Sequence, residues 1–180
     1  QGGLPLVDTL ELKAPGSFFV TALAWTVIPT TISALQGVGV LWSMLALLGI
    51  YVGGRLLFTA QAGLFSATLY VCLAPIVDSM DVNYGAWMIA PYIWAFVCFF
   101  TWYKKDRLRW LVAAGLLLAF AGLLKRQGAV LTPLFIGSIG LIVWARTPRT
   151  SRFSARVSAP FFAFFSGLAL GFAPILAFYR

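Results

Sequence analysis

The stretch Ala34–Gly54 reads ALQGVGVLWSMLALLGIYVGG and is followed directly by Arg55. A helix needs roughly 20 predominantly apolar residues to cross the hydrocarbon core of a bilayer. This stretch meets that length without one charged residue. The whole chain is also strongly apolar, with 61% hydrophobic and 10% charged residues. Such a composition is typical of integral membrane proteins and not of soluble domains. We therefore expect an all-α fold, a polytopic membrane helix bundle.

Further apolar stretches follow, separated by short charged turns. They are Ala62–Val77, Gly85–Tyr103, Trp110–Leu124, Gly128–Ala145 and Ala159–Tyr179. The third and fourth of these are separated only by Lys125–Gln127, so one broken helix is an alternative to two spans. The earlier stretch Ser17–Thr30 is too short to span, and we expect it to lie at the interface or to re-enter. The sequence thus predicts about six transmembrane spans plus one interfacial helix, in a single domain. Its residues 1–33 form an external loop with the interfacial helix, and residues 34–180 form the spans.

The charges predict the orientation of these spans. With the first loop outside, nine of the thirteen basic residues fall inside: Arg55, Lys104, Lys105, Arg107, Arg109, Arg146, Arg149, Arg152 and Arg156. This is the positive-inside pattern, which also explains the net charge of +8 without a nucleic-acid partner. All acids except Asp106 fall outside. Three turns therefore share the outer face: Asp8–Lys13, Asp78–Asn83 and Lys125–Gln127.

Ionisable residues gathered at one face of a membrane bundle indicate a functional site. The carboxylates could act as a general base toward an acceptor hydroxyl; they are Asp8, Glu11, Asp78 and Asp81. The cations could neutralise a phosphate; they are Lys13, Lys125 and Arg126. Each of these residues can equally be an ordinary charge of a wet loop, since terminal lysines and arginines extend to the headgroups.

Other chemistry finds little support in the sequence. Histidine is absent, which removes imidazole bases and the commonest zinc ligand. Cys72 and Cys98 both lie inside apolar runs and form no metal-binding or disulfide pattern. We expect no cofactor, and dependence on a divalent metal is left open.

The segment GGLPLVDTLELKAPGSFF, residues 2–19, is polar and punctuated by Gly and Pro. It resembles the first external loop of C-type membrane glycosyltransferases, in the group of protein O-mannosyltransferases and lipid A aminoarabinose transferases. That loop reads Gly-Gly-Leu-Pro-Tyr-x-Asp, followed by Glu-x-Lys-Pro-Pro-Gly; here Ala14 replaces the first proline. Residues 53–58, 73–75 and 114–128 are similar to later motifs of the group in the same order, although Lys125 and Arg126 stand where one lysine is usual.

The resemblance implies transfer of a sugar from a polyprenyl-phosphate donor to a lipid, glycan or protein acceptor of the cell envelope. It implies that Lys13 lies by the donor phosphate and that a second acid of the group corresponds to Asp81 or to Asp78. It also implies an integral protein of the bacterial inner membrane, surrounded by membrane lipids, with its active face periplasmic. The main catalytic acid of the group precedes this loop, so we expect it upstream of Gln1. The chain then reads as an internal fragment that is inactive alone.

Two other classes compete with the enzyme. A transporter would carry ionisable residues near the middle of its spans or paired broken helices. In this sequence the charges fall at the ends of the spans, which argues against a permeation path. A structural membrane subunit would not need the clustering of acids and bases on one face.

Overall fold

The computed structural model describes residues 22, 25–26, 31–73, 84–125, 130–146 and 155–178. Within these ranges the chain forms helices and no strand. The helices are α2 (Ile32–Leu57), α3 (Ala60–Leu73), α4 (Tyr84–Lys105), α5 (Arg109–Leu124), α6 (Thr132–Arg146) and α7 (Ala155–Phe178). The predicted all-α fold is confirmed. The predicted interfacial segment Ser17–Thr30 lies outside the described residues except for Ala22, Trp25 and Thr26.

Each predicted span corresponds to one helix, with shifted ends. Helix α2 continues past Arg55 to Leu57, and α7 begins at Ala155, before the predicted start at Ala159. Hydropathy marks the apolar part of a helix, whereas the helix itself continues through flanking residues whose long side chains extend toward water. The alternative of one broken helix is wrong. Lys125 is extended, with φ −150° and ψ 133°, and α6 runs back beside other helices.

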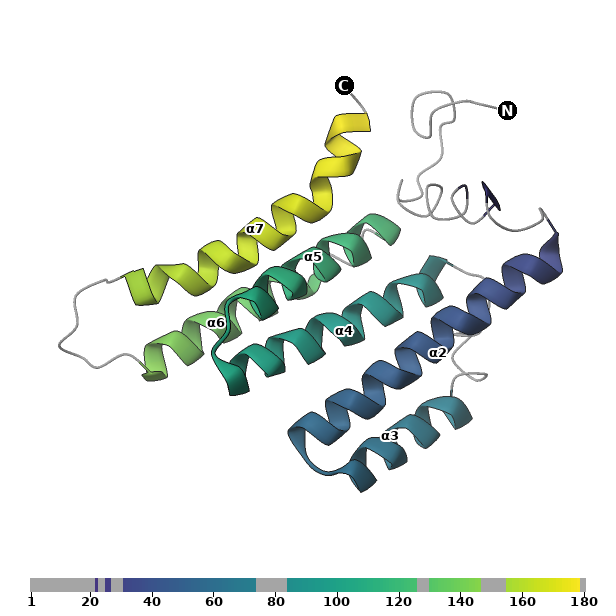
Figure 1. Cartoon of the computed structure of the whole chain (residues 1–180), viewed down its shortest axis with the longest axis horizontal. Helices are drawn as coiled ribbons and strands as arrows, with labels where there is room; N and C mark the ends of the chain where they lie inside the picture. The colour runs from purple at the N-terminus through teal and green to yellow at the C-terminus, as the bar shows by residue number, and fades with distance from the viewer. Residues whose placement is uncertain are drawn as a thin grey trace.

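Successive helices run in alternating directions (Figure 1). Helices α2 and α4 lie parallel, because Trp42 in the first half of α2 contacts Trp87 in the first turn of α4, and Lys104 reaches the Leu56 carbonyl in the last turn of α2. Helices α4 and α6 are parallel as well, since the Arg146 guanidinium bonds to Asp106 just after α4. The starts of α2, α4 and α6 therefore lie at one end of the bundle, and their last turns lie at the other.

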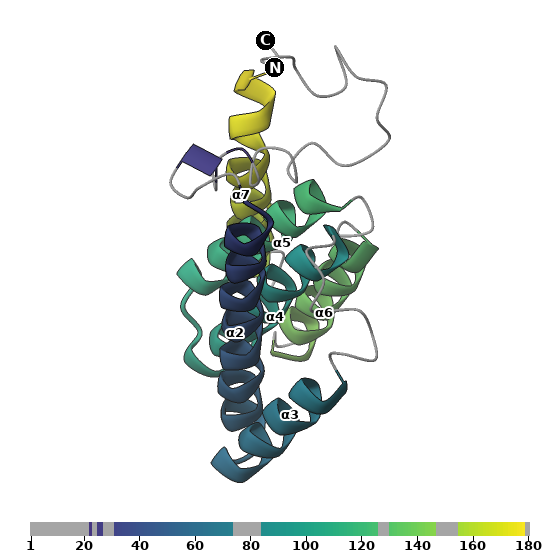
Figure 2. The same ribbon diagram turned by 90° about the vertical axis from the view of Figure 1, so that its right-hand side faces the viewer.

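The helices form a row in the order α3, α2, α4, α5, α7, and Figure 1 shows this row face-on. Helix α6 does not belong to this row. It lies against one face of it, behind α4, α5 and α7 in Figure 1, and Figure 2 shows it displaced to one side of α2 and α7. The spatial order thus differs from the order along the chain.

Helices α5 and α7 approach each other closely at glycines. A Cβ atom on Gly167 would lie 2.0 Å from the Val112 carbonyl oxygen, and one on Gly115 would lie 2.2 Å from the Phe164 carbonyl oxygen. A Cβ on Gly171, four residues after Gly167, would lie 2.5 Å from Ala119 Cβ. Small residues four apart let helix backbones approach within a membrane, where apolar burial alone does not favour association. The same device joins α2 to α3, where Gly54 and Gly63 are in contact.

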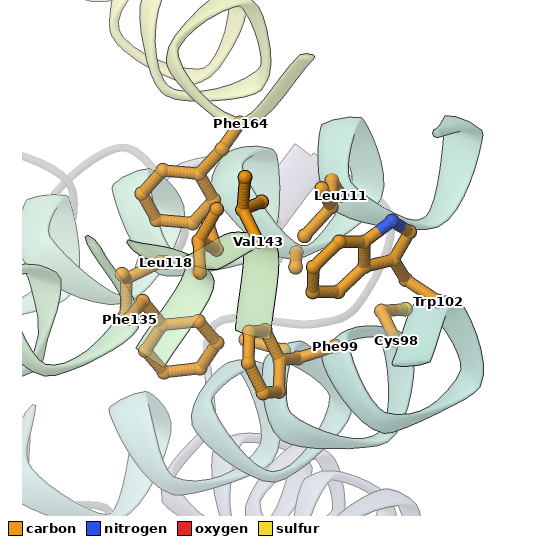
Figure 3. Close-up of a cluster of buried hydrophobic side chains, with 11 residues drawn as sticks. Cys98, Phe99, Trp102, Leu111, Leu118, Phe135, Val143 and Phe164 are labelled. Atoms are coloured by element: carbon orange, nitrogen blue, oxygen red, sulfur yellow. The ribbon is translucent and has the colours of Figure 1, made fainter. Parts of the chain in front are cut away.

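Aromatic rings fill the space where α4, α5, α6 and α7 meet (Figure 3). Phe135 of α6 is buried and lies 5.3 Å from the ring of Phe99 and 5.9 Å from that of Phe164. Figure 3 shows Leu111 and Leu118 of α5 completing the cluster. Rings at such separations interact favourably beyond their burial. Helix α6 is therefore held by large side chains and not by close backbone contact.

Two of the described helices are long and apolar enough to cross a membrane: Gln36–Leu57 within α2 and Val157–Pro174 within α7. Helices α3, α5 and α6 are apolar but have only 14, 16 and 15 residues. At about 1.5 Å per residue they fall short of a hydrocarbon core of about 30 Å. The six-span arrangement accordingly stays a prediction.

We predict that Gly167→Ala destabilises the protein by about 1–3 kcal/mol, the usual cost of overpacking. The added methyl group would meet the backbone of Val112, which cannot move aside as a side chain can. Gly137→Ala is the matched control, because a Cβ there would find nothing within 4 Å. The control should be neutral or stabilising by up to about 1 kcal/mol, since Ala favours helix over Gly. Thermal unfolding of both variants in detergent is the measurement, and equal transitions would contradict this packing.

Candidate functional site

The two ends of the bundle differ in charge. We call "the basic end" the end at which α2, α4 and α6 finish and α3, α5 and α7 begin. Its charged residues within the described ranges are Arg55, Lys104, Lys105, Asp106, Arg107, Arg109, Arg146 and Arg156. We call the opposite end "the Lys125 end", because Lys125 is the charged residue that the described part of the chain places there. The segregation of basic residues expected from the sequence is present in this geometry.

Several cations at the basic end stabilise helix termini. The Lys104 ammonium donates to the Leu56 carbonyl oxygen in the last turn of α2. Arg146 donates through Nη2 to the Tyr103 carbonyl oxygen at 2.6 Å and through Nη1 to the Asp106 carboxylate at 3.2 Å. The last carbonyls of a helix lack partners within the helix and attract positive charge. These residues therefore have a structural use at the basic end.

Asp106 ends α4 by its backbone conformation. Its φ of 52° is left-handed, and its N–H donates to the Trp102 carbonyl oxygen at 2.7 Å. Aspartate is among the few residues that tolerate this conformation beyond a helix C-terminus. With its carboxylate paired to Arg146, Asp106 is a helix-ending residue.

Three predicted turns were expected to share one face, and the structure places the helix ends beside two of them. Leu73 ends α3 and Tyr84 begins α4, on either side of the Asp78–Asn83 turn. Leu124 ends α5 and Thr132 begins α6, around the Lys125–Gln127 turn. All four helix ends lie at the Lys125 end (Figure 1).

An aromatic cluster supports the helices at this end. The Trp42 indole N–H donates to the Trp87 carbonyl oxygen at 2.7 Å, and the two rings lie 5.8 Å apart. The ring of Phe120 lies 6.3 Å from that of Trp42. These contacts tie the first half of α2 to the start of α4 and to the last turns of α5. They fix the positions from which the Asp78–Asn83 and Lys125–Gln127 turns depart.

Lys125 is the one predicted site residue within the described ranges. Its backbone N–H donates to the Ala121 carbonyl oxygen at 3.1 Å and closes the last turn of α5. Leu124 and Ala121 beside it are fully buried. Lys125 therefore stands at the end of a well-packed helix, and its structural bond is made by the backbone and not by the ammonium.

The other predicted site residues lie outside the described residues. They are Asp8, Glu11, Lys13, Asp78, Asp81 and Arg126. The roles predicted for them, and the dependence on a divalent metal to which their carboxylates could contribute, stay predictions. Among the described ranges no three potential metal ligands lie together.

The interiors of the described helices carry polar groups but no charges. Three hydroxyls bond to carbonyl oxygens of their own helices: Thr101 donates to Val97, Thr68 to Leu64 and Ser166 to Ala163. A hydroxyl so bonded is satisfied without a ligand or a neighbouring helix. This part of the chain therefore lacks the charged residues within the helices that a transport path would be expected to contain.

Sequence reasoning missed the features that order the helices. Gly167 and Gly171 form a small-xxx-small pair, and so do Gly49 and Gly53 on the α4-facing side of α2. This spacing is a readable signal of close helix packing in membranes. The Trp42–Trp87 contact was also missed, although Trp87 lies near the end of a predicted span, where aromatic belts occur.

Comparison with known families gives one finding. A family model described as dolichyl-phosphate-mannose-protein mannosyltransferase matches residues 12–175. The match includes α2 to α6 in full and α7 as far as Ile175. Searches of curated proteins and of solved structures gave no match.

We predict that Lys125→Ala leaves the fold intact, because alanine keeps the backbone bond to Ala121. The loss of the ammonium should weaken binding of a polyprenyl phosphate about tenfold, as expected for one charge-assisted hydrogen bond of about 1.5 kcal/mol. Lys105→Ala, at the basic end, is the matched control and should bind as the wild type does. Binding and thermal unfolding of the purified protein are the measurements. Unchanged affinity in Lys125→Ala would remove this residue from the site.

Proposed function

Since the chain belongs to the dolichyl-phosphate-mannose-protein mannosyltransferase family of membrane glycosyltransferases, we propose that it serves transfer of a hexose or pentose from a polyprenyl-phosphate donor. The acceptor is a lipid, glycan or protein of the cell envelope. The observation that carries the location of the site is the segregation of charge between the two ends of the bundle. Lys104 and Arg146 at the basic end are engaged with helix termini, whereas the helix ends that flank the Asp78–Asn83 and Lys125–Gln127 turns lie at the Lys125 end.

We place the reaction at the Lys125 end. The acid of the described basic end, Asp106, is paired with Arg146 and ends a helix, so its position already has a structural explanation. The helix ends that flank Asp78, Asp81 and Arg126 lie at the Lys125 end. Chemistry that needs a carboxylate and a cation together therefore fits this end.

The proposed chemistry uses the two kinds of charge differently. A carboxylate, Asp81 or Asp78, accepts the proton of the acceptor hydroxyl as its oxygen attacks the anomeric carbon of the sugar. Asp8 and Glu11 are the other candidate carboxylates. The bond between that carbon and the phosphate oxygen breaks, and polyprenyl phosphate leaves with an added negative charge. Cations stabilise this charge as it develops.

The donor phosphate is assigned to Lys13, Lys125 and Arg126. Lysine presents a compact charge on a flexible stem, and arginine presents a planar fork suited to two phosphate oxygens. Lys125 follows directly on the buried Leu124, which fixes its backbone. We place the protein in the bacterial inner membrane with the Lys125 end facing the periplasm, on the basis of the basic residues at the other end.

Reconstitution of the full-length protein in liposomes tests the proposal. Polyprenyl-phosphate sugars of defined head group and chain length are supplied together with candidate acceptors, and sugar transfer is measured. Transfer from a polyprenyl-phosphate donor supports the proposal, with a nucleotide sugar as the control that should fail. Equal transfer from the nucleotide sugar would overturn the assignment of the donor.

Topology provides a second test. In a background lacking Cys72 and Cys98, we predict that Asp78→Cys is labelled by a membrane-impermeant thiol reagent added outside. Arg152→Cys should react only after permeabilisation, because basic loops stay inside. Labelling of both positions from the same side would overturn the six-span arrangement.

Lys13→Ala in the full-length protein should lower the rate of transfer about 100-fold or more, the scale for removal of one preorganised donor. Lys13→Arg should recover part of the rate, since a planar fork does not reproduce a point charge. If Lys13 instead forms a surface ion pair with Glu11, its removal costs only about 0–1 kcal/mol of stability and leaves transfer unchanged. Initial rates and donor affinity, measured at matched expression, separate these outcomes.

A further inference from the structure

We propose that a groove between α4 and α6 holds an acyl chain of an anionic phospholipid, with the lipid phosphate at the basic end near Arg146. The groove has a volume of about 400 Å³ and opens to the outside. Its wall is formed by rings of α4 and by apolar side chains of α6: Phe96, Phe99, Phe100, Tyr103, Leu134, Phe135, Leu141 and Ile142, with Ser138 among them. The inference rests on the six-span arrangement proposed above and does not depend on sugar transfer.

The groove exists because α6 is held away from α4 by aromatic rings. Phe135 lies 4.9 Å from the ring of Phe96 and 5.3 Å from that of Phe99. The glycines of α6 make no close approach, since a Cβ on Gly137 would meet nothing within 4 Å and one on Gly140 would lie 3.8 Å from Phe161. Nothing here resembles the backbone contact of α5 with α7.

The exposed rims of the groove are apolar. Leu134 and Leu141 of α6 are 54% and 66% exposed, and Tyr103 at the end of α4 is 46% exposed. Between membrane helices the neighbouring molecules are lipids, and an unfilled groove would forfeit the dispersion contacts of its lining. A flexible hydrocarbon chain fits such an elongated apolar space. The apolar lining of the groove thus favours an acyl chain but does not by itself select a head group.

The charge at the basic end selects the head group. The groove reaches Tyr103, and the Arg146 guanidinium lies 4.8 Å from the centre of the Tyr103 ring. That guanidinium is exposed and has five N–H groups, of which the bonds to Asp106 and the Tyr103 carbonyl use two. Basic pockets between membrane helices on the cytoplasmic side bind anionic lipid head groups.

The excess of cations around Arg146 also favours an anionic head group. Arg55, Lys104, Lys105, Arg107, Arg109 and Arg146 face a single acid, Asp106, within the described residues of this end. Within the described ranges Arg146 forms an ion pair with Asp106, whose carboxylate is itself 81% exposed. A phosphate would therefore reduce an unbalanced positive charge. The groove reaches the basic end, opposite the turns assigned to the sugar donor, so its occupant is a lipid of the bilayer and not the donor.

A photoactivatable phosphatidylglycerol with a diazirine in its acyl chain tests the site. The full-length protein is reconstituted in vesicles of phosphatidylcholine containing this probe, irradiated, and digested for mass spectrometry. We expect adducts on the residues of α4 and α6 that line the groove and displacement by excess unlabelled phosphatidylglycerol. An equivalent phosphatidylcholine probe should label these positions at least fivefold less.

Two substitutions test the chain and the head group separately. Ser138→Trp should fill the groove and reduce labelling at least fivefold, whereas Ser166→Trp, on an exposed position of α7, should not. Arg146→Gln should remove the preference for phosphatidylglycerol, and Arg146→Lys should keep part of it. Arg55→Gln is the matched control, because α2 does not line the groove.

Displacement of the probe by unlabelled phosphatidylglycerol is measured on the wild-type protein, so this test does not depend on how the variants fold. Equal labelling by both probes, labelling away from α4 and α6, or displacement by millimolar inorganic phosphate would each overturn the proposal. The readout uses neither sugar transfer nor the sidedness of the protein. Its failure is thus distinguishable from failure of the proposed function.

Discussion

The contact between α5 and α7 is the constraint on which the arrangement of the other helices depends. In a membrane the apolar surfaces of helices gain little by leaving lipid for one another, so close packing and backbone contact decide which helices pair. Gly115 and Gly167 allow these two backbones to touch, and any larger residue would meet a carbonyl oxygen about 2 Å away. Because α7 thereby occupies the place beside α5, the intervening helix α6 lies outside the row (Figure 2).

The two ways of packing have different consequences. Glycine contacts join α5 to α7 and α2 to α3, and they leave no room between the backbones. Aromatic rings hold α6, and they leave the groove beside Phe96 and Leu141. The looser packing of α6 is offset in part at the basic end, where Arg146 ties the last turn of α6 to that of α4. The bundle therefore contains a close-packed row and one helix held mainly by its rings and its last residue.

The sequence was sufficient to predict the helices, because a long apolar run such as Ala34–Gly54 can hardly satisfy its backbone in lipid except as a helix. The alternation of charge also predicted which helix ends lie together. It did not predict the order of the row, because parallel pairs such as α2 and α4 are not consecutive and depend on local contacts such as that of the Trp94 ring with the backbone at Gly49. Nor did it predict the groove, which depends on how far the ring of Phe135 holds two helices apart.

The candidate site was predictable only by its charges. The resemblance suggested roles for Lys13 and for Asp81 or Asp78, while the structure adds the support beneath Lys125. Before this lysine, Leu118, Ala119, Ala121 and Leu124 are all buried, so its backbone is set by the best-packed helix of the bundle.

After Lys125 the chain leads to α6, whose Gly137 has open space around it. The turn thus joins a firmly held helix to a loosely held one, with Lys125, to which we assign the donor phosphate, on the firm side. A cation that stabilises a developing charge is most effective when it need not reorganise as the bond breaks. The backbone bond from Lys125 to Ala121 holds the main chain of this residue at the end of α5, and the phosphate-binding role that we propose for its ammonium would draw on that support.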